Sequence, residues 1–488
     1  MRKLTFLFLA FGSACVSAPA YEPPTVKVAP SYSVAPAPTR TRSAADSCPP
    51  GSSVVQTPSS VHYSDALPVA PFWRTLGDRV LADLIEEALR ANTDVQIAES
   101  RLTGARAARR LAAFDLAPTV TASGSSIRQQ ASIAQLPGFG RQLPPEQLWD
   151  VGFDAAWEVD FFGRVARNVR ARSALATSAE YGLRDVQVSV AAEVGRTYFE
   201  LRGAQQQLAV AQKNADNQRH TVAITKDRLA AGRGTAFDTE RAQSILYLTL
   251  ATMPALETEI ARDRNRLAVL LGRTPDLLPH ALAEAAAPSR LPDSLDIGTP
   301  SNLVRRRPDV LRAERALAAR ELLVGAAKAD YVPRISLGAR LGYTATSFDS
   351  LSRAGTSRLL VGPFISFPLF DLGRVKERVD LARADADEAR TEHNATVLRA
   401  LEETQVALVS YDRAHARLAI LEDAVRSSQR ASALSQQRFE AGLTDFLQVL
   451  DAERTLLDAE NQLALGHTAA ATALVAVYKA VGGTWPLQ

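Results

Sequence analysis

The chain has little of what catalytic and metal-binding proteins commonly use. Only two of its 488 residues are cysteine, Cys15 and Cys48, which excludes a disulfide framework and a cysteine-based zinc site. Its six histidines are scattered, and no two of them have metal-ligand spacing. Lys and Arg number 56 against 53 Asp and Glu, and a net charge of +3 is too balanced to indicate nucleic-acid binding. No uninterrupted apolar run reaches the roughly 18 residues of a membrane-spanning helix.

What is present indicates a folded, mostly helical protein. The hydrophobic content of 46% and the charged content of 22% exclude disorder along the whole chain. A length of 488 residues is more than one compact core usually needs, so we expect two or three structural units.

The N-terminus predicts export and lipid attachment. Arg2 and Lys3 precede a short apolar stretch at 4–11, so residues 1–14 are interpreted as a signal peptide. Small residues then lead to Cys15, as in the processing site of bacterial lipoproteins, although Gly12 stands where that site usually has Leu. Acyl chains on Cys15 would anchor the protein, since each buried methylene contributes about 0.8 kcal/mol. An ordinary secreted protein with a chance cysteine remains the alternative.

Residue 16 is Val and not Asp, so the signal that retains such lipoproteins in the inner membrane is absent. Residues 15–72 are then rich in Pro, Ser and Ala, a composition that cannot bury a core and predicts an extended N-terminal tether. Cys48 lies in this tether without an evident partner.

The rest of the chain is a tandem duplication. Residues 90–118 match 305–333 at an offset of 215, and further ordered matches follow at an offset of 210. The second set includes glycine and arginine pairs that alanine-rich composition cannot supply: Gly152 with Gly362, Gly163 with Gly373, Arg164 with Arg374, Gly232 with Gly442. We therefore predict two structural repeats, 73–295 and 296–488, each with a helix, two strands and a long helical hairpin.

The helical hairpins can be read from glycine, proline and apolar spacing. Residues 374–441 contain neither Gly nor Pro and predict an unbroken helix of about 100 Å with coiled-coil-like spacing. The apolar step of eight residues between Ala389 and Val397 indicates a local register shift. Gly442 is expected to end this helix, and Asp445 to cap the next.

The first repeat has the same turn signals, with Gly232, Thr235 and Asp238 in place of their second-repeat counterparts. It differs by Pro254 inside the returning helix, where we expect a kink or a break.

Four strands are predicted, near 118–128, 149–160, 333–344 and 358–370. In the second and third, apolar and charged residues alternate with a period of two, as in a transmembrane strand between lipid and a watery lumen. A half-buried strand of a soluble sheet shows the same pattern. Four strands cannot close a barrel, and open edges are not tolerated in hydrocarbon, so a membrane location requires several protomers. The expected lipid-facing residues are Trp149, Val151, Phe153, Ile335, Leu337 and Leu341, and the expected lumen-facing residues are Asp150, Asp154, Arg334 and Arg340.

Several stretches in order resemble the outer-membrane factor family, the TolC/OprM-like proteins, in its NodT-type lipoprotein branch. The matching stretches are 157–164 (WEVDFFGR), 303–310 (LVRRRPDV) with its continuation to 337, 449–454 (VLDAER) and 478–485 (YKAVGGTW). The resemblance extends from Trp73 to Trp485.

The resemblance implies a mainly helical, tandem-duplicated TolC-like fold and a homotrimer. Four strands from each of three chains would form a 12-stranded barrel in the outer membrane, and long helices a periplasmic α-barrel. Such proteins are passive exit ducts of multidrug efflux pumps and work with a periplasmic membrane-fusion adaptor and an inner-membrane RND-type transporter. The resemblance implies no enzymatic activity, no cofactor and no metal, and contact with outer-membrane lipid.

The same resemblance implies a gate at the periplasmic tip, where the two helical turns lie. Leu447, Asp451 and Arg454 match the family's constricting and latching positions and share one helical face. Three symmetry-related Asp451 carboxylates would repel one another and need compensating cations. The alternative is that Asp451 is a first-turn acid favoured by the helix dipole, and that Asp238 is a cap rather than a fourth gate residue.

Other functions stay open at this stage. A duct for type I protein secretion or for metal export has the same architecture, and the transported substrate cannot be read from the sequence. A structural coiled-coil surface lipoprotein is less consistent with two strand pairs and a twofold repeat. An enzyme is disfavoured because no nucleophile, acid-base or phosphate-binding constellation is found.

Overall fold

The computed structural model describes most of the chain after the first 60 residues. The described residues are 32, 61–66, 71–130, 132, 134, 144–275, 278, 282–283, 285–286 and 290–483. Cys15, Cys48, the predicted signal peptide 1–14 and most of the predicted tether lie outside them.

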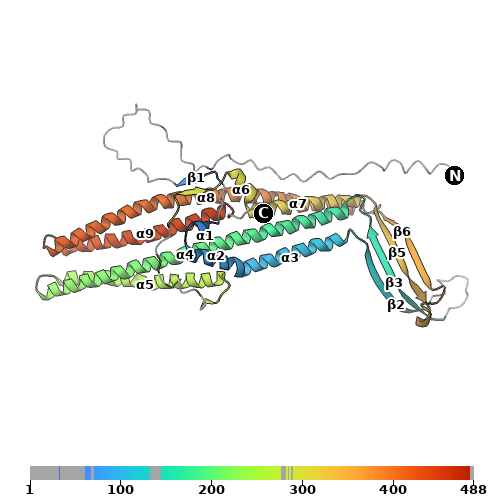
Figure 1. Cartoon of the computed structure of the whole chain (residues 1–488), viewed down its shortest axis with the longest axis horizontal. Helices are drawn as coiled ribbons and strands as arrows, with labels where there is room; N and C mark the ends of the chain where they lie inside the picture. Colours follow the sequence, from blue (N-terminus) through green and yellow to red (C-terminus); the bar gives the residue numbers. More distant parts are fainter. Residues whose placement is uncertain are drawn as a thin grey trace, which may run out of the picture. The chain divides into compact units, whose positions relative to one another are not determined.

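The two repeats have the same order of elements (Figure 1). In the first repeat these are α3 (Thr93–Phe114), β2 (Thr119–Gln129), β3 (Glu146–Glu158), α4 (Arg164–Ala230) and α5 (Ala236–Leu270). In the second they are α7 (Pro308–Lys328), β5 (Arg334–Ala345), β6 (Ser357–Ser366), α8 (Leu372–Glu440) and α9 (Phe446–Ala480). Short 3₁₀ helices at Ala329–Tyr331 and Phe348–Ser350 flank β5. The order helix, strand, strand, long helix, long helix is the one that the duplicated sequence predicts.

Smaller elements precede each repeat. They are β1 (His62–Ser64), α1 (Phe72–Thr75) and α2 (Arg79–Ala91) before the first, and β4 (Ser294–Asp296) and α6 (Pro300–Arg306) before the second. Strand β1 pairs in parallel with β4. The Tyr63 hydroxyl donates to the Leu408 carbonyl oxygen at 2.9 Å, and Val61 is buried. Residues 61–66 of the predicted tether 15–72 therefore pack onto the folded part of the chain, because Val61 is buried and the partly buried Tyr63 contacts the same core.

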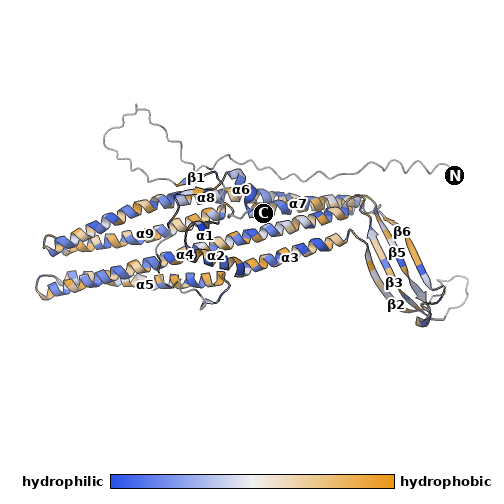
Figure 2. Cartoon of the chain, in the orientation of Figure 1, coloured by the Kyte–Doolittle hydropathy of each residue, from blue (hydrophilic) through white to orange (hydrophobic). Residues whose placement is uncertain are grey.

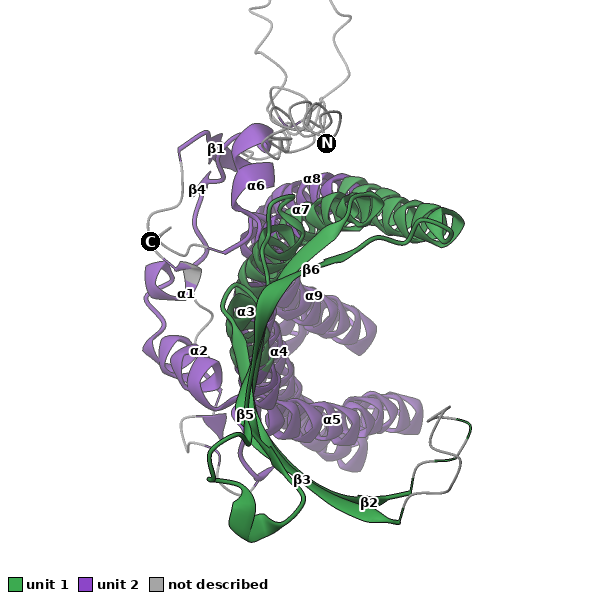
Figure 3. Ribbon diagram, turned by 90° about the vertical axis from the view of Figure 1, so that its right-hand side faces the viewer, with its two compact units in different colours: residues 1–25, 101–180, 312–394 green, residues 26–100, 181–311, 395–488 purple. Residues whose placement is uncertain are grey.

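The chain divides into two compact units that cut across the repeats (Figure 3). Unit 1 contains residues 1–25, 101–180 and 312–394, and unit 2 contains residues 26–100, 181–311 and 395–488. Each unit therefore takes parts from both repeats. The ranges 73–295 and 296–488 are the two copies of the duplicated sequence. The compact units differ from them, because each unit combines segments of both copies.

Unit 1 contains a four-stranded antiparallel sheet in the order β2-β3-β5-β6, seen as a curved layer in Figure 3. The central β3–β5 pair joins the two repeats, with Trp157 opposite Leu337 and Asp154 opposite Arg340. The strands begin and end within four residues of the predicted ranges. Among the described residues, β2 and β6 have no strand partner on their outer edges.

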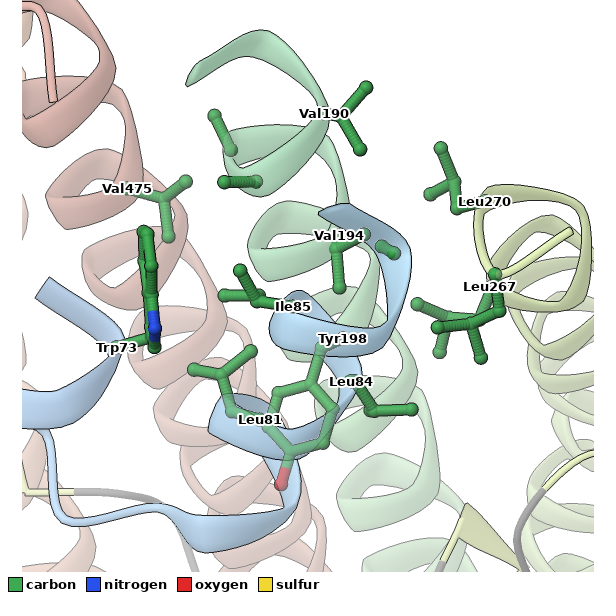
Figure 4. Packing of buried hydrophobic residues seen from close by; sticks show 14 of the residues in the cluster. Trp73, Leu81, Leu84, Ile85, Val190, Val194, Tyr198, Leu267, Leu270 and Val475 are labelled. Carbon is green, nitrogen blue, oxygen red and sulfur yellow. The ribbon is translucent and has the colours of Figure 1, made fainter. Parts of the chain in front are cut away.

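Unit 2 holds the largest apolar core (Figure 4). Leu81, Leu84 and Ile85 of α2 pack against α4, where Val194 and Tyr198 point toward them. Asp78 caps α2 by accepting from the Leu81 amide at 3.1 Å, and its second carboxylate oxygen accepts from the Tyr198 hydroxyl at 2.8 Å. The cap and the core therefore fix α2 across α4.

A buried arginine joins four segments of unit 2. Arg307, between α6 and α7, donates two hydrogen bonds to Asp309 at 2.8 and 2.9 Å and one to Glu403 at 2.6 Å. It also donates to the Ala480 carbonyl at the end of α9, at 3.1 Å, and to the Ala400 carbonyl, at 3.4 Å. This Arg307 lies in the sequence stretch 303–310, and its role there is to tie α7, α8 and the last turn of α9 together.

Helix α8 runs through the expected register shift because a polar side chain occupies the missing core position. His393 is buried and lies between Ala389 and Val397, four residues from each. The pattern of apolar residues alone does not include His393, because histidine is polar. Buried residues therefore recur regularly along α8, although one of them, His393, is polar.

Helix α5 continues without a break from Ala236 to Leu270 through Pro254. Of the kink or break expected at this proline, the break is therefore absent, and the kink stays a prediction. Proline removes the intrahelical hydrogen bond that would reach the Leu250 carbonyl, and the helix continues on both sides of this one missing bond.

Helix α9 is the one described helix that is long and apolar enough to cross a membrane by composition. Half of its most apolar 18-residue window is buried inside the protein. Its side chains, among them Leu474 and Val475, belong to the cores of unit 2. Its hydropathy is therefore explained by packing.

Candidate functional site: a two-faced sheet and two helical turns

The sheet of unit 1 has an apolar face whose side chains are exposed. Cross-strand register places Val120, Phe153, Leu341 and Leu359 on one face, and all are more than half exposed. Val361 and Ile365 of the edge strand β6 are both 71% exposed on the same face. Figure 2 shows apolar residues along all four strands. An apolar face this large is not left to water in a soluble protein, so it needs an apolar surrounding.

The opposite face carries paired charges. Asp150 accepts from Thr344 at 2.7 Å and pairs with Arg358 at 2.5 Å. One strand pair further along, Asp154 lies 3.5 Å from Arg340. The residues predicted to face a lumen, including Asp150 and Arg340, therefore share a face, and those predicted to contact lipid share the other.

Two glycines let β3 and β5 approach closely on the polar face. Gly152 lies directly opposite Gly342. A Cβ atom added at Gly152 would lie 2.6 Å from the Leu341 carbonyl oxygen, and one at Gly342 would lie 2.4 Å from that of Val151. Only glycine fits at both positions without a shift of the backbone.

The turns of both helical hairpins lie in unit 2, and they have the same construction. Gly232 and Gly442 have φ values of 70° and 72°, which favour glycine. The amides of Arg233 and Leu443 each donate to a carbonyl five residues back at 2.8 Å, as in a Schellman motif. Asp445 then accepts from the Gln448 amide at 3.2 Å, the cap that the sequence predicts.

The predicted gate residues lie just after these turns. Leu447, Asp451 and Arg454 are exposed on α9, one helical turn apart on one face. Within the described part of a single chain, Asp451 and Arg454 form no ion pair. Asp238 is engaged differently: it forms a capping box with Thr235, whose hydroxyl donates to the Asp238 carboxylate at 2.6 Å. The structure therefore gives Asp238 the capping role that the sequence left open.

The two hairpins meet in a small core near the turns. Val222 of α4 and Leu246 of α5 pack with Phe439 of α8 and Phe446 of α9. The Arg228 guanidinium lies over the Phe439 ring, 3.8 Å from its centre. The position of α9, and with it that of Asp451, depends on this contact between the repeats.

One acidic residue beside the gate had no role in the sequence reading. Glu453 points toward α4, where the Thr221 hydroxyl donates to its Oε1 at 3.2 Å. Burial raises the pKa of the Glu453 carboxyl, and the Thr221 hydrogen bond lowers it by less. The sequence signal was present, since an acid three residues after Leu450 and four after Val449 falls on the buried face of α9.

Among the described residues, no group of three or more His, Cys, Asp or Glu side chains could hold a metal ion.

A sheet with one exposed apolar face, followed in each repeat of the chain by a long helical hairpin, defines the class of this protein: it is an outer-membrane channel with a TolC-like fold.

Comparison with known proteins gives the family. Residues 84–273 and 299–483 match the model of the outer membrane efflux protein family, so the chain belongs to this family. It is 30% identical over 476 residues to outer membrane protein OprJ of Pseudomonas aeruginosa, covering 97% of this chain and 93% of OprJ. It is 28% identical over 415 residues to the solvent efflux pump outer membrane protein SrpC of Pseudomonas putida, covering 84% and 87%.

Solved structures agree with this assignment. The outer-membrane channel OprN superposes with a TM-score of 0.82 at 37% identity, over 88% of this chain and 95% of OprN. VceC from Vibrio cholerae superposes with a TM-score of 0.78 at 26% identity, over 86% and 99%. The chain is thus an outer-membrane efflux protein, and its relatives are channels rather than enzymes.

Proposed function

We propose that this chain is the passive exit duct of a tripartite efflux pump, and that it works as a homotrimer. The observation that carries the proposal is the sheet β2-β3-β5-β6, which has an exposed apolar face and two unpaired edge strands. Unpaired backbone groups are not tolerated in hydrocarbon. Three copies, each joining its β6 to the β2 of the next, close a barrel of twelve strands without an edge.

The polar face of the sheet then lines the lumen. Its carboxylates and guanidiniums are paired, as Asp150 is with Arg358, so the lumen is wetted without a large excess of one charge. Gly152 and Gly342 have no side chains, so they occupy little space on the polar face, as is suitable on the inner side of a curved sheet. The long hairpins α4–α5 and α8–α9 continue the duct into the periplasm.

The partners follow from the pump. A periplasmic adaptor and an inner-membrane RND-type transporter deliver the substrate, and the duct supplies neither energy nor chemistry. Substrates are drugs and other toxic compounds, in keeping with relatives such as SrpC, whose name describes a solvent efflux pump. Cys15 carries the lipid that anchors the N-terminus in the outer membrane.

The gate of this duct is formed by Leu447, Asp451 and Arg454. The exposed Asp451 carboxylate has no cation partner within the described part of one chain, so a neighbouring copy supplies it in the closed trimer. Around the threefold axis, three such pairs act together, and Leu447 narrows the bore by its bulk. Asp238 belongs to the same gate as a secondary member, and its carboxylate also serves the capping box at the start of α5.

Two measurements on the purified full-length protein test this function. The mass of the detergent-solubilised assembly should correspond to three chains, and insertion into planar bilayers should give discrete conductance steps. A monomer without conductance would contradict the proposal, and it would favour a structural lipoprotein.

A further inference from the structure

One face of α4 carries a stripe of uncharged polar residues that is buried between the two hairpins. Asn214, Gln218, Thr221 and Thr225 are spaced by four, three and four residues, so they lie on one helical face. Each is at most 8% exposed. We call these four residues the α4 polar stripe. Buried polar groups need partners, so whatever faces the stripe determines how firmly the hairpins hold together.

Two acids of α9 meet the stripe, and their surroundings differ. Glu460 accepts from the Asn214 amide at 3.3 Å and lies 3.6 Å from the Lys213 ammonium. Among the described residues, Glu453, two turns earlier, accepts a hydrogen bond only from the Thr221 hydroxyl, at 3.2 Å. Glu460 therefore has a cation to compensate its charge, whereas Glu453 is held by one neutral donor.

Two buried oxygen atoms at this level have no hydrogen-bond partner among the described residues. They are Oε2 of Glu453 and Oε1 of Gln218. Gln218 precedes Thr221 by three residues on the same face of α4, which places its amide one turn from the Thr221–Glu453 hydrogen bond. Two acceptors cannot satisfy each other. A proton on Glu453 turns its carboxyl into a hydrogen-bond donor, which an uncharged polar stripe can accept, whereas the ionised carboxylate can only accept.

The side chains that face Glu453 offer no charge to replace that proton. The buried face of α4 is uncharged, and its nearest cation, Arg228, lies over the Phe439 ring. The inward face of α8 at this level consists of serine and apolar residues. On α5, Asp238 is bound in its capping box, and Glu240, Arg241 and Tyr247 are exposed. On α9, Asp451, Arg454 and Asp458 are exposed, and Glu460 is paired with Lys213. Among the described residues, the pKa of the Glu453 carboxyl is shifted by burial and by the Thr221 hydrogen bond, without a contribution from a charged side chain.

We propose that Glu453 is a proton-operated latch between α4 and α9: its neutral carboxyl bonds the two hairpins, and its ionisation loosens them. This deepens the proposed gate and rests on it in one respect, namely that the duct opens when these hairpins move. Because Glu453 lies between Asp451 and Arg454 in sequence, any shift of α9 at this point moves the gate residues with it.

The direction of the pH effect follows from the burial. A buried carboxyl without a cation favours its neutral form, so the packed hairpins bind the proton more tightly than the separated ones. The contact is therefore firmest below the ordinary carboxyl pKa. It weakens as the pH rises through the raised pKa, by about tenfold in the packing equilibrium for each unit by which that pKa is raised.

Hydrogen exchange on the full-length assembly tests the latch directly. The measured quantity is the protection factor, the intrinsic exchange rate at each pH divided by the observed rate, for peptides covering 214–228 and 446–457 between pH 5 and pH 8. The wild type should lose protection as the pH rises, by about tenfold for each unit by which the pKa of the Glu453 carboxyl is raised. Glu453→Gln, which keeps the shape and supplies a permanent donor, should remain protected and lose this pH dependence.

Two further variants sharpen the result. Glu460→Gln is the matched control, since it neutralises the other acid of the same face, and it should keep the wild-type pH profile. Thr221→Val removes the donor that favours the charged form, so its midpoint should move to higher pH. A pH profile in Glu453→Gln equal to that of the wild type would overturn the latch.

Conductance recorded over the same pH range separates the latch from the gate. If protection changes with pH and depends on Glu453 while conductance stays constant, the latch stands and the proposed gate does not. If conductance changes with pH while protection does not, the latch is wrong.

Discussion

Arg228 and Phe439 come from different repeats, and the guanidinium of the first lies 3.8 Å from the ring centre of the second. The same guanidinium donates to the Phe439 carbonyl oxygen at 3.4 Å. The duplication relates these positions: Arg228 is the counterpart of Arg438, and it contacts Phe439, the residue that follows Arg438 in the other repeat. The contact thus joins the ends of two equivalent hairpins.

Arg228→Ala should loosen the hairpin ends without unfolding the protein. The lost cation–π contact is worth about 0.5–2 kcal/mol, and Arg228 is only half-buried. We expect a several-fold loss of hydrogen-exchange protection in residues 436–450. Arg219→Ala is the control, because Arg219 pairs with Asp216 on its own helix and not across the hairpins. Equal effects of the two substitutions would show that the Phe439 contact is not specific.

Arg307→Ala should lower stability far more. It leaves the Asp309 carboxylate and the last carbonyl of α9 without their buried partner, and breaking such a pair by removing one side costs about 3–5 kcal/mol. Thermal unfolding of the detergent-solubilised protein measures this loss. The neighbouring Arg305 is exposed, so Arg305→Ala should change the unfolding temperature little. A mild effect at Arg307 would mean that the ends of α9 and α6 are held by packing alone.

The faces of the sheet can be tested with cysteines. Leu337→Cys, on the apolar face, should resist a membrane-impermeant thiol reagent, and Arg340→Cys, on the polar face, should react with it. Introducing Arg at Leu341 should cost about 2–4 kcal/mol if lipid covers this face. The reverse labelling pattern would invert the assignment of lipid and lumen.

The gate predicts leak in single substitutions. Asp451→Ala and Arg454→Ala should each raise single-channel conductance, by about tenfold or more in the open-to-closed ratio, because three weak pairs of about 0.2–1 kcal/mol act together. The effect of the double substitution on conductance should be less than the sum of the two single effects, since both charges belong to the same ion pairs. Leu447→Ala should widen the bore sterically. Glu440→Ala, at the exposed end of α8, is the control, and unchanged conductance in all gate variants would place the constriction elsewhere.

Lipid attachment is predicted at one residue, Cys15. Cys15→Ser should abolish fatty-acid labelling of the mature protein, whereas Cys48→Ser should leave it unchanged. The protein should still reach the membrane, because the barrel supplies a second attachment. Undiminished labelling of Cys15→Ser would show that the N-terminus is not lipidated there.

The sequence predicted those parts of the fold that depend on local patterns. The alternation at Trp149 to Glu158 depends on a period of two, and the turns at Gly232 and Gly442 depend on one residue with positive φ. Such signals are contained in a few neighbouring residues. They were sufficient for the strands, the long helices and the caps at Thr235 and Asp445.

The parts that were missed depend on contacts between distant residues. His393 fills a core position of α8 that only its surroundings define, and Glu453 acquires its environment from α4, more than 200 residues away in sequence. Helix α5 runs on through Pro254, which a local rule against proline inside helices does not anticipate. Polar residues in helix–helix contacts look like surface residues until the partner helix is known.

Cross-linking of the two edge strands tests the central claim most directly. In a Cys48→Ser background, a cysteine at Ser123 of β2 is combined in turn with cysteines at Arg358, Leu360, Gly362 and Phe364 of β6, which scan the register between neighbouring chains. Since β3 and β5 separate these strands within one chain, a disulfide between them joins different copies. The account predicts that at least one pair gives a covalent ladder that ends at three chains. A monomer in every pair, or a ladder that continues beyond three, would contradict the trimeric barrel.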